Sequence, residues 1–329
     1  MRVVITGGAG FIGKRLAAKL LERGSLTDAA GQVREITELV LVDMAPAQNE
    51  PWLIDKRVTQ VVGDITDRNV LATALTQDTG SIFHLAAVVS GQAEADFDIG
   101  MRVNVDSTRT LLELTRLLPM PPKFVFTSSI AVFGGALPAV LPDDQIMTPQ
   151  GSYGAQKAMC ELLVSDMSRR GMIDGRSLRL PTVTVRPGKP NKAASSFASG
   201  IIREPLAGAD FVCPASPEAK MWCLSPPRVV GNIIIGHEAL ASALPYTRSV
   251  SVPGITVSVR EMVESLRRVA GDAFAARISW QLDPVVDRLV SSWPQAFTAH
   301  RGKSLGMTID AGFDDIVRAH IAAMTSQGG

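Results

Sequence analysis

Two side chains in this sequence are spaced for proton transfer from one face of a helix. Tyr153 and Lys157 stand four residues apart, about one turn from each other on the helix expected over residues 153–170. A phenol with a pKa of about 10 is a poor base at neutral pH, but a neighbouring ammonium group stabilises the phenolate and lowers that pKa. The pair predicts a base that removes a proton from a substrate hydroxyl.

A serine completes this candidate catalytic group. Ser129 stands just beyond the strand expected over residues 123–128, where its hydroxyl can hydrogen-bond the substrate oxygen that Tyr153 attacks. A serine in such a position also often caps a turn or a helix. The combination of Ser129, Tyr153 and Lys157, rather than any one of them, carries the prediction.

Three glycines near the N-terminus predict a dinucleotide site. Gly7, Gly10 and Gly13 follow a short apolar strand, residues 2–6, and open an amphipathic helix that runs to Gly24. The first glycine permits a tight turn and the second lets the backbone approach a pyrophosphate. The third lets the helix pack closely on the strand, while the N–H groups of its first turn face negative charge. The alternative is a glycine-rich turn that binds no ligand.

Two acidic residues at strand ends extend this site. Asp43 ends a strand over residues 38–43, where its carboxylate can accept hydrogen bonds from both ribose hydroxyls but would repel a 2′-phosphate, so NAD is favoured over NADP. Asp64 and Ile65 follow a strand over 58–63, where the acid can reach an adenine amino group and the isoleucine can pack on the ring. Each acid can instead be an ordinary turn residue.

The elements that must position these residues alternate along the chain. Helices such as those over residues 99–117 and 153–170 separate apolar strands over 2–6, 38–43, 58–63, 81–85, 123–128 and 177–185. This alternation indicates parallel strand–helix–strand units and therefore an α/β fold, a doubly wound parallel sheet of the Rossmann type. Pro181 implies that the sixth strand ends or bends there.

A change of pattern near residue 186 predicts a second lobe. Beyond it the chain contains loops, scattered helices and proline clusters at 214–217 and 226–227. We expect residues 1–185 to form the NAD-binding Rossmann domain, and residues 186–329 to form mainly a smaller C-terminal substrate lobe with some segments packing back on the first domain. The helices over 258–270 and 313–324 are amphipathic and are expected to be structural.

Composition excludes several classes of function. The 329 residues carry 33 Lys and Arg against 32 Asp and Glu, so no basic excess exists for binding nucleic acid. The three cysteines, Cys160, Cys213 and Cys223, form no CxxC pair, and with four histidines they show no metal-ligand spacing. No signal-peptide pattern and no apolar run of about 18 residues occurs. We expect a cytoplasmic protein without metal, membrane or nucleic-acid partners.

Taken together, these segments resemble the extended short-chain dehydrogenase/reductase family, also called the NAD-dependent epimerase/dehydratase family. The resemblance runs the whole length of the chain, and its most similar motifs are Thr6 to Gly13, Asp64-Ile65, His84 to Ala87, Asn104 to Thr108, Thr127 to Gly134 and Tyr153 to Lys157.

The resemblance implies residue roles that spacing alone does not. It makes Ser129, Tyr153 and Lys157 the catalytic residues, with Lys157 also holding the nicotinamide ribose and Pro181 touching the nicotinamide. The implied cofactor-binding residues are Gly7, Gly10, Phe11, Ile12, Gly13, Asp43, Asp64, Ile65, Leu85, Ala86, Ala87, Asn104, Tyr153, Lys157 and Pro181. It also implies a homodimer formed through the helices over 99–117 and 152–170. His84 is expected to be a core histidine rather than a catalyst.

Departures from the sugar-nucleotide members indicate a different substrate lobe. Residues 179–183 and 225–229 lack the usual patterns, whereas residues 178–197, 201–206 and 313–319 resemble the D-erythronate dehydrogenase branch of the family. That resemblance implies oxidation of the C2 hydroxyl of a small sugar acid to the 2-oxo acid. The candidate substrate-binding residues are Ser129, Tyr153, Thr182, Arg186, Asn191 and Ser195.

Some of these substrate roles have structural alternatives. Arg186 can make a bidentate contact with a carboxylate, or it can tie down the Pro-Gly loop that follows it. Asn191 and Ser195 precede an apolar helix whose free N–H groups can receive an anion, but a serine there can also be only a cap. Two other functions use the same cofactor motifs: a nucleotide-sugar epimerase or dehydratase with tightly bound NAD, and a non-catalytic regulator that senses NAD.

Overall fold

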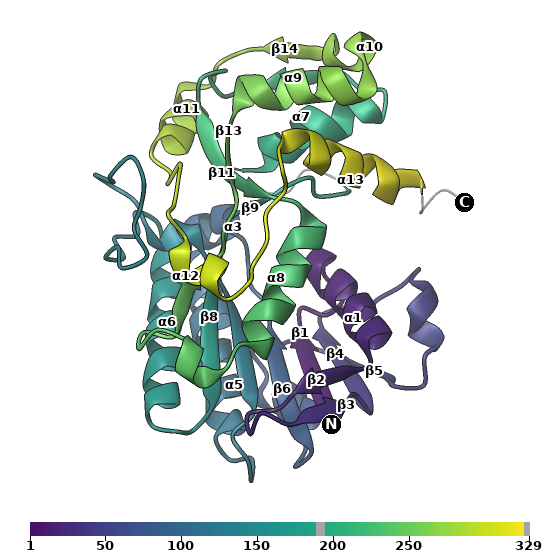
Figure 1. Cartoon of the computed structure of the whole chain (residues 1–329), viewed down its shortest axis with the longest axis vertical. Helices are drawn as coiled ribbons and strands as arrows, with labels where there is room; N and C mark the ends of the chain where they lie inside the picture. The colour runs from purple at the N-terminus through teal and green to yellow at the C-terminus, as the bar shows by residue number, and fades with distance from the viewer. Residues whose placement is uncertain (189–194, 326–329) are drawn as a thin grey trace.

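A seven-stranded parallel sheet forms the centre of the protein. The computed structural model describes residues 1–188 and 195–325. Across the sheet the strands run in the order β12 (Ser249–Ser251), β8 (Asp174–Leu180), β7 (Lys123–Ser129), β6 (Thr79–His84), β1 (Arg2–Thr6), β4 (Glu38–Asp43) and β5 (Val58–Val62), and every neighbouring pair is parallel (Figure 1). The expected Rossmann-type α/β fold is confirmed.

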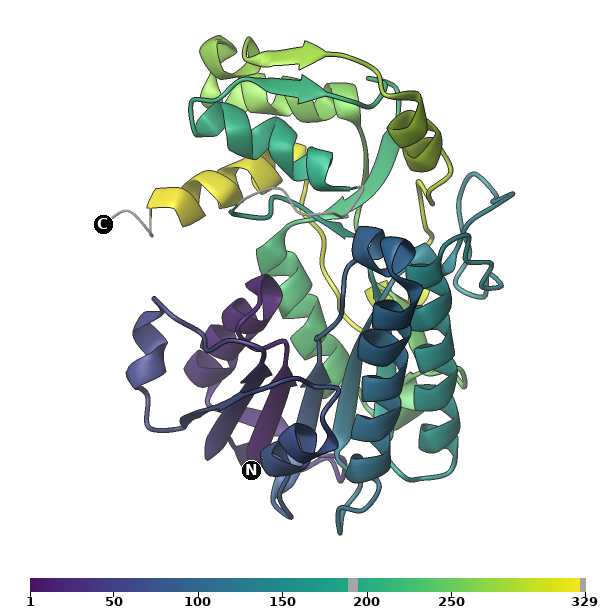
Figure 2. The same ribbon diagram turned by 180° about the vertical axis from the view of Figure 1, so that it is seen from behind.

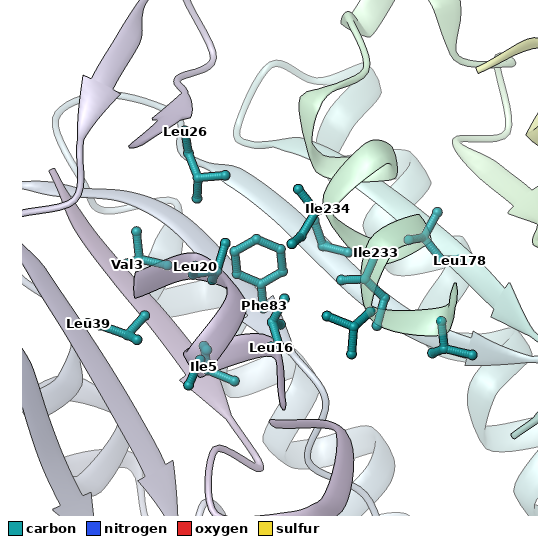
Figure 3. Packing of buried hydrophobic residues seen from close by; sticks show 14 of the residues in the cluster. Val3, Ile5, Leu16, Leu20, Leu26, Leu39, Phe83, Leu178, Ile233 and Ile234 are labelled. Carbon is teal, nitrogen blue, oxygen red and sulfur yellow. The ribbon is translucent and has the colours of Figure 1, made fainter. Parts of the chain in front are cut away.

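Helices cover both faces of this sheet because its strands are apolar on both faces. Val3 and Ile5 pack with α1 (Phe11–Arg23) and α8 (Pro226–Glu238) in a core centred on Phe83 (Figure 3). Val4 points to the opposite core, which α2 (Arg68–Ala74), α5 (Ser107–Thr115) and α6 (Ser152–Arg169) cover. Successive residues of a strand face opposite sides, so continuous apolar runs such as RVVIT bury both faces.

The strand order reverses at β1, which pairs with β4 on one side and β6 on the other. The loops that follow the carboxyl ends of β1 and β6 lead away in opposite directions and leave a crevice between them. The glycine turn after β1 and residues 85–89 after β6 stand at this crevice.

Two expected elements differ from the observed ones. The helix expected over 99–117 consists of α4 (Phe97–Gly100), a π-helical turn η2 (Met101–Asp106) and α5. The strand expected over 177–185 stops at Leu180, because Pro181 has no N–H for the ladder; β9 (Thr182–Val183) then pairs with β11 (Lys220–Leu224) in another sheet.

A second lobe lies over the carboxyl edge of the sheet (Figure 2). Its core joins α7 (Ser196–Leu206), α9 (Val259–Ala270) and α13 (Phe313–Thr325). Its other elements are β10 (Phe211–Cys213), β11, β13 (Ile255–Ser258), α10 (Asp272–Ala275), β14 (Ile278–Trp280) and α11 (Pro284–Ser291); β10 pairs with β14, and β13, β11 and β9 form a small sheet.

Parts of the C-terminal half return to the first domain. Helix α8 packs on α1 and the sheet, β12 forms the edge beyond β8, and α12 (His300–Ser304) packs near β12. The division at residue 186 stays a prediction. The remaining elements are the unpredicted hairpin of β2 (Ser25–Thr27) and β3 (Val33–Glu35) and the short helices η1 (Pro51–Ile54), α3 (Ser90–Ala95), η3 (Ile130–Val132) and η4 (Ala241–Ala243).

Candidate active site

The glycine turn after β1 has a geometry that only glycine fits. Gly7 has a φ of 71°, and a Cβ atom there would lie 2.9 Å from the backbone nitrogen of Ala86. A Cβ atom at Gly13 would overlap the carbonyl oxygen of Gly7, so the first turn of α1 packs directly on the loop. The first turn of α1 contains no acidic residue, so its free N–H groups are not neutralised by a carboxylate of the same turn.

A cleft of about 720 Å³ runs from this turn to the start of α6. Its volume is within the range of about 300–1,000 Å³ typical of ligand pockets. Its lining includes Gly7, Gly10, Phe11, Ile12, Gly13, Asp43, Asp64, Ile65, Leu85, Ala86, Ala87, Tyr153, Lys157 and Pro181. The residues predicted to bind the cofactor are thus brought together, except Asn104, and a cradle closed to any Cβ atom fits a dinucleotide.

Both strand-end acids line the cleft and also hold turns. The carboxylate of Asp43 accepts hydrogen bonds from the backbone N–H groups of Ala9, at 3.0 Å, and Met44, at 2.8 Å. Asp64 accepts one from the N–H of Thr66 at 2.8 Å. Asp43 thereby connects the end of β4 to the glycine turn. Its role in the turn is compatible with the predicted role in binding the ribose, because it also lines the cleft.

Tyr153 and Lys157 lie in the first two turns of α6, at the inner end of the cleft. The helix starts close to the loop after β7, since a Cβ atom at Gly154 would overlap the carbonyl oxygen of Ala131. The Lys157 Nζ donates to the carbonyl oxygen of Thr127 at 2.9 Å and lies 5.6 Å from the centre of the Tyr153 ring. Burial lowers the pKa of Lys157 to about 8.

Tyr153 is subject to two opposed influences. Burial raises the pKa of its hydroxyl, and the positive charge of Arg186 lowers it. Ser129 ends β7 and lines the same cleft, while its Oγ accepts a hydrogen bond from the N–H of Ala131 at 3.1 Å. Ser129 is therefore both a cap of η3 and a lining residue.

A buried ion pair ties together the elements that carry these residues. Glu161 on α6 pairs with Arg179 on β8, at 2.8 Å between Nη2 and Oε2, and also accepts a hydrogen bond from the hydroxyl of Ser128 on β7. The side chains of Arg179 and Glu161 are 7% and 2% exposed, so water hardly screens the pair. The contact fixes α6 relative to the ends of β7 and β8.

Asn104 acts behind the cleft rather than in its lining. Its Oδ1 accepts from the N–H of Val88 at 2.9 Å, and its Nδ2 donates to Val88 O at 3.3 Å and to Gln156 Oε1 at 2.8 Å. These contacts join the π-helical turn to the loop after β6. His84 is buried between the hydroxyls of Thr6 and Thr108, and burial lowers its pKa to about 3, as suits a neutral core histidine.

A second, smaller cavity of about 150 Å³ adjoins Tyr153. Of the predicted substrate-binding residues, Ser129, Tyr153, Thr182, Arg186 and Ser195 line it, and Asn191 lies outside the described residues. Its lining also contains Val89, Ser90, Ile130, Ala131, Leu180, Pro181, Trp293 and Pro294.

Arg186 places a cation at this small cavity. Its Nε donates to the carbonyl oxygen of Val183 at 3.2 Å, and its backbone is held by Ser199 and Arg203. Within residues 1–188 and 195–325, no acidic side chain forms an ion pair with its guanidinium. Burial lowers the pKa of Arg186, because water no longer fully solvates the charge.

Sequence reasoning missed Trp293 and Pro294. They stand about 140 positions beyond Tyr153 in an irregular segment, where neither spacing nor periodicity marks a residue as part of a site. The described residues contain no metal-binding cluster of acidic, histidine or cysteine side chains. None of the helices in the described ranges is both long and apolar enough to cross a membrane.

The sequence and the fold are similar to those of known proteins. The model of the NAD dependent epimerase/dehydratase family matches residues 3–222. The chain is 53% identical over 321 residues to the D-erythronate dehydrogenase of Cupriavidus necator, covering 98% of each chain. It is 41% identical to that of Haemophilus influenzae, covering 98% of this chain and 99% of the relative. A crystal structure described as the nucleoside-diphosphate-sugar epimerase from Agrobacterium tumefaciens superposes with a TM-score of 0.91 at 40% identity, over 98% of this chain and 94% of that one.

Proposed function

Because the chain belongs to the NAD-dependent epimerase/dehydratase family, we propose that it oxidises the C2 hydroxyl of a small sugar acid, D-erythronate, to 2-oxo-D-erythronate. The expected family is confirmed, and both full-length relatives carry the same enzyme name. The protein is an NAD-dependent dehydrogenase of this family.

The position of Arg186 at the small cavity is the main support for an acid as the substrate. A buried charge is costly unless a partner of opposite sign accompanies it. Arg186 is half-buried, lines the cavity together with Tyr153, and forms no ion pair with an acidic side chain among the described residues. A substrate carboxylate would supply the missing charge and would form a charge-assisted hydrogen bond with the guanidinium.

In the proposed mechanism the chain's own residues bind the acid and move one proton. The glycine turn, Asp43 and Lys157 would hold NAD, which when bound supplies the acceptor for the hydride. Arg186 holds the carboxylate, and Ser129 orients the C2 hydroxyl oxygen. Tyr153 as phenolate takes the hydroxyl proton while C2 loses its hydride, and the C–O single bond becomes a carbonyl.

The nearby ammonium of Lys157 supports the ionised form of Tyr153. The Lys157 Nζ lies 5.6 Å from the centre of the Tyr153 ring; Lys157 is buried and Tyr153 is half-buried, so water screens the charge less than in bulk solvent. In the proposed mechanism this ammonium group would offset part of the cost that burial imposes on the phenolate.

The epimerase alternative has support from the name of the Agrobacterium structure. A nucleotide sugar is much larger than a four-carbon acid, and the cavity beside Ser129 and Tyr153 has only about 150 Å³. Pockets that bury larger ligands typically have about 300–1,000 Å³. The small cavity favours the acid.

The test is a substrate panel with purified protein and added NAD. The proposal expects NADH absorbance to rise with D-erythronate and not with UDP-sugars. Formation of a sugar epimer without net NADH would support the epimerase instead, and no turnover of any hydroxy acid or sugar would leave the NAD-sensing regulator.

We also propose a cytoplasmic homodimer formed through α4, η2, α5 and α6. Met159 and Leu162 on α6 are exposed apolar side chains, 38% and 62%, as a contact face would require. Light scattering coupled to gel filtration tests the dimer, since a monomer mass at micromolar concentration contradicts it.

A further inference from the structure

The segment after α11 forms one wall of the small cavity. Trp293 and Pro294 are the lining residues that come from the chain beyond Ser195. The same two residues also line another cavity, of about 190 Å³, together with Gly135, residues 137–139 and their own neighbours in 291–295. Trp293 and Pro294 therefore stand between two cavities.

This wall is fixed on both sides. The N–H of Trp293 donates to the carbonyl oxygen of Val290 at the end of α11, at 3.1 Å. Ala296, three residues after Trp293, accepts a hydrogen bond at its carbonyl oxygen from the N–H of Leu141, at 2.9 Å. The Phe297 ring lies 5.4 and 5.8 Å from two other aromatic rings, measured between ring centres. The indole thus belongs to a braced segment and forms a steric boundary.

We infer that Trp293 limits the length of the sugar acid that the site accepts, an inference that rests on the proposed function. Arg186, Ser129, Tyr153 and Trp293 line one cavity of about 150 Å³. With the carboxylate at Arg186 and the C2 hydroxyl at Ser129 and Tyr153, the rest of the carbon chain would share the cavity with Trp293. A longer acid must enter space that the indole fills.

Because Trp293 lines both cavities, we expect removal of the indole to open the small cavity towards the second one. Trp293→Ala therefore provides room for the extra carbons of five- and six-carbon acids. One unaccommodated carbon in a closely fitting pocket typically changes kcat/KM by about 10–200-fold, so the effect of the substitution is large enough to measure.

The experiment compares kcat/KM for D-erythronate with that for D-ribonate and D-allonate, which keep the configuration of erythronate at C2 and C3. NADH absorbance is the readout, at saturating NAD. We expect Trp293→Ala to shift the preference towards the longer acids by about tenfold or more, and Trp293→Phe to shift it less. Trp280→Ala is the matched control: it removes an indole from β14 in the same lobe, away from the residues that line either cavity, and should leave the preference unchanged.

Thermal unfolding and NAD binding establish that each variant is folded, and Trp293→Phe retains a ring for packing if the alanine variant does not fold. A preference within about twofold of the wild type in the folded Trp293 variants overturns the inference while the proposed function stands. Loss of activity towards all acids in folded variants that bind NAD also overturns it. If the wild-type protein oxidises no hydroxy acid, the proposed function fails and the inference falls with it.

Discussion

The charges around Tyr153 decide at which pH its hydroxyl can act as a base. Burial raises the pKa of the phenol, and the Arg186 cation counteracts that rise. Arg186 thus has two effects in the proposed mechanism, since the same charge that attracts the carboxylate favours the phenolate. Because one charge serves both, the binding of the carboxylate and the ionisation of Tyr153 should depend on each other.

A substitution at Arg186 separates these effects. Arg186→Gln removes the charge, the pKa of Tyr153 rises further, and a higher pH is needed to form the phenolate. The ascending limb of the pH profile of kcat/KM should therefore move to higher pH, and KM for the acid should rise by at least about tenfold. Arg260→Gln, which changes an exposed arginine on α9, is the control. An unmoved limb would contradict the charge coupling.

The proton transfer itself is tested at Tyr153. Tyr153→Phe keeps the ring and removes the hydroxyl, and we expect turnover to fall by about 10²–10⁴-fold while NAD still binds. The chain has one other tyrosine, Tyr246, whose side chain is 89% exposed, so Tyr246→Phe is a matched control with unchanged turnover. Retention of most of the activity in Tyr153→Phe would remove the mechanism.

At the scale of elements, the contact between Glu161 and Arg179 holds the catalytic helix in place. It links α6 to β8, and Ser128 adds β7 through the same carboxylate. Helix α6 carries Tyr153 and Lys157, β7 ends with Ser129, and Pro181 directly follows β8. A change in the ion pair therefore affects both stability and the relative positions of the site residues.

Removing the charge of Glu161 leaves Arg179 buried without its partner. Glu161→Gln should lower the free energy of unfolding by about 3–5 kcal/mol, the usual effect of breaking one side of a buried pair. Urea denaturation measures this change. Glu264→Gln removes a carboxylate from an exposed pair with Arg267 on α9 and should change stability by less than about 1 kcal/mol. Equal stability of the two variants would show that burial does not matter here.

Apolar strands and the glycine turn were predictable because their signals are local. Residues 2–6 bury both faces of one strand, and Gly7 and Gly13 occupy positions where the backbone leaves no room for a side chain, while a Cβ atom at Gly10 would lie 3.1 Å from the carbonyl oxygen of Gly7. The π-helical turn over Met101–Asp106 was not predictable, because apolar periodicity continues through it and its contacts come from Val88 and Gln156, far away in sequence. Trp293 was not predictable for a different reason: it lies in an irregular segment about 140 positions beyond Tyr153, where no periodicity marks it.

On the scale of the whole molecule, the first domain is completed by residues from the second half of the chain. Helix α8 covers one face of the sheet, and β12 pairs with β8 as its edge strand. Without residues 226–251, the apolar side chains of Leu178 and Phe83 would lose much of their cover. We therefore expect the predicted cofactor domain to depend on the chain that follows residue 186.

A fragment that ends at residue 188 tests this dependence. We expect it to aggregate or to unfold without a cooperative transition, because it lacks α8 and β12. Gel filtration and thermal unfolding followed by circular dichroism measure both properties against the full chain. A monomeric fragment that unfolds cooperatively would show that the first domain is complete by residue 188.

The late arrival of β12 also has a consequence during synthesis. Strand β8 ends at Leu180 and its edge partner begins at Ser249, so the ribosome must add the intervening residues before the sheet can be closed. At roughly 5–20 residues per second this takes several seconds. If the earlier strands pair in that interval, β8 would be an open edge until β12 is made, and an open edge is a site for pairing with other nascent chains. We expect chaperones to occupy the nascent chain most strongly in this window, as ribosome-bound chaperone profiling would reveal.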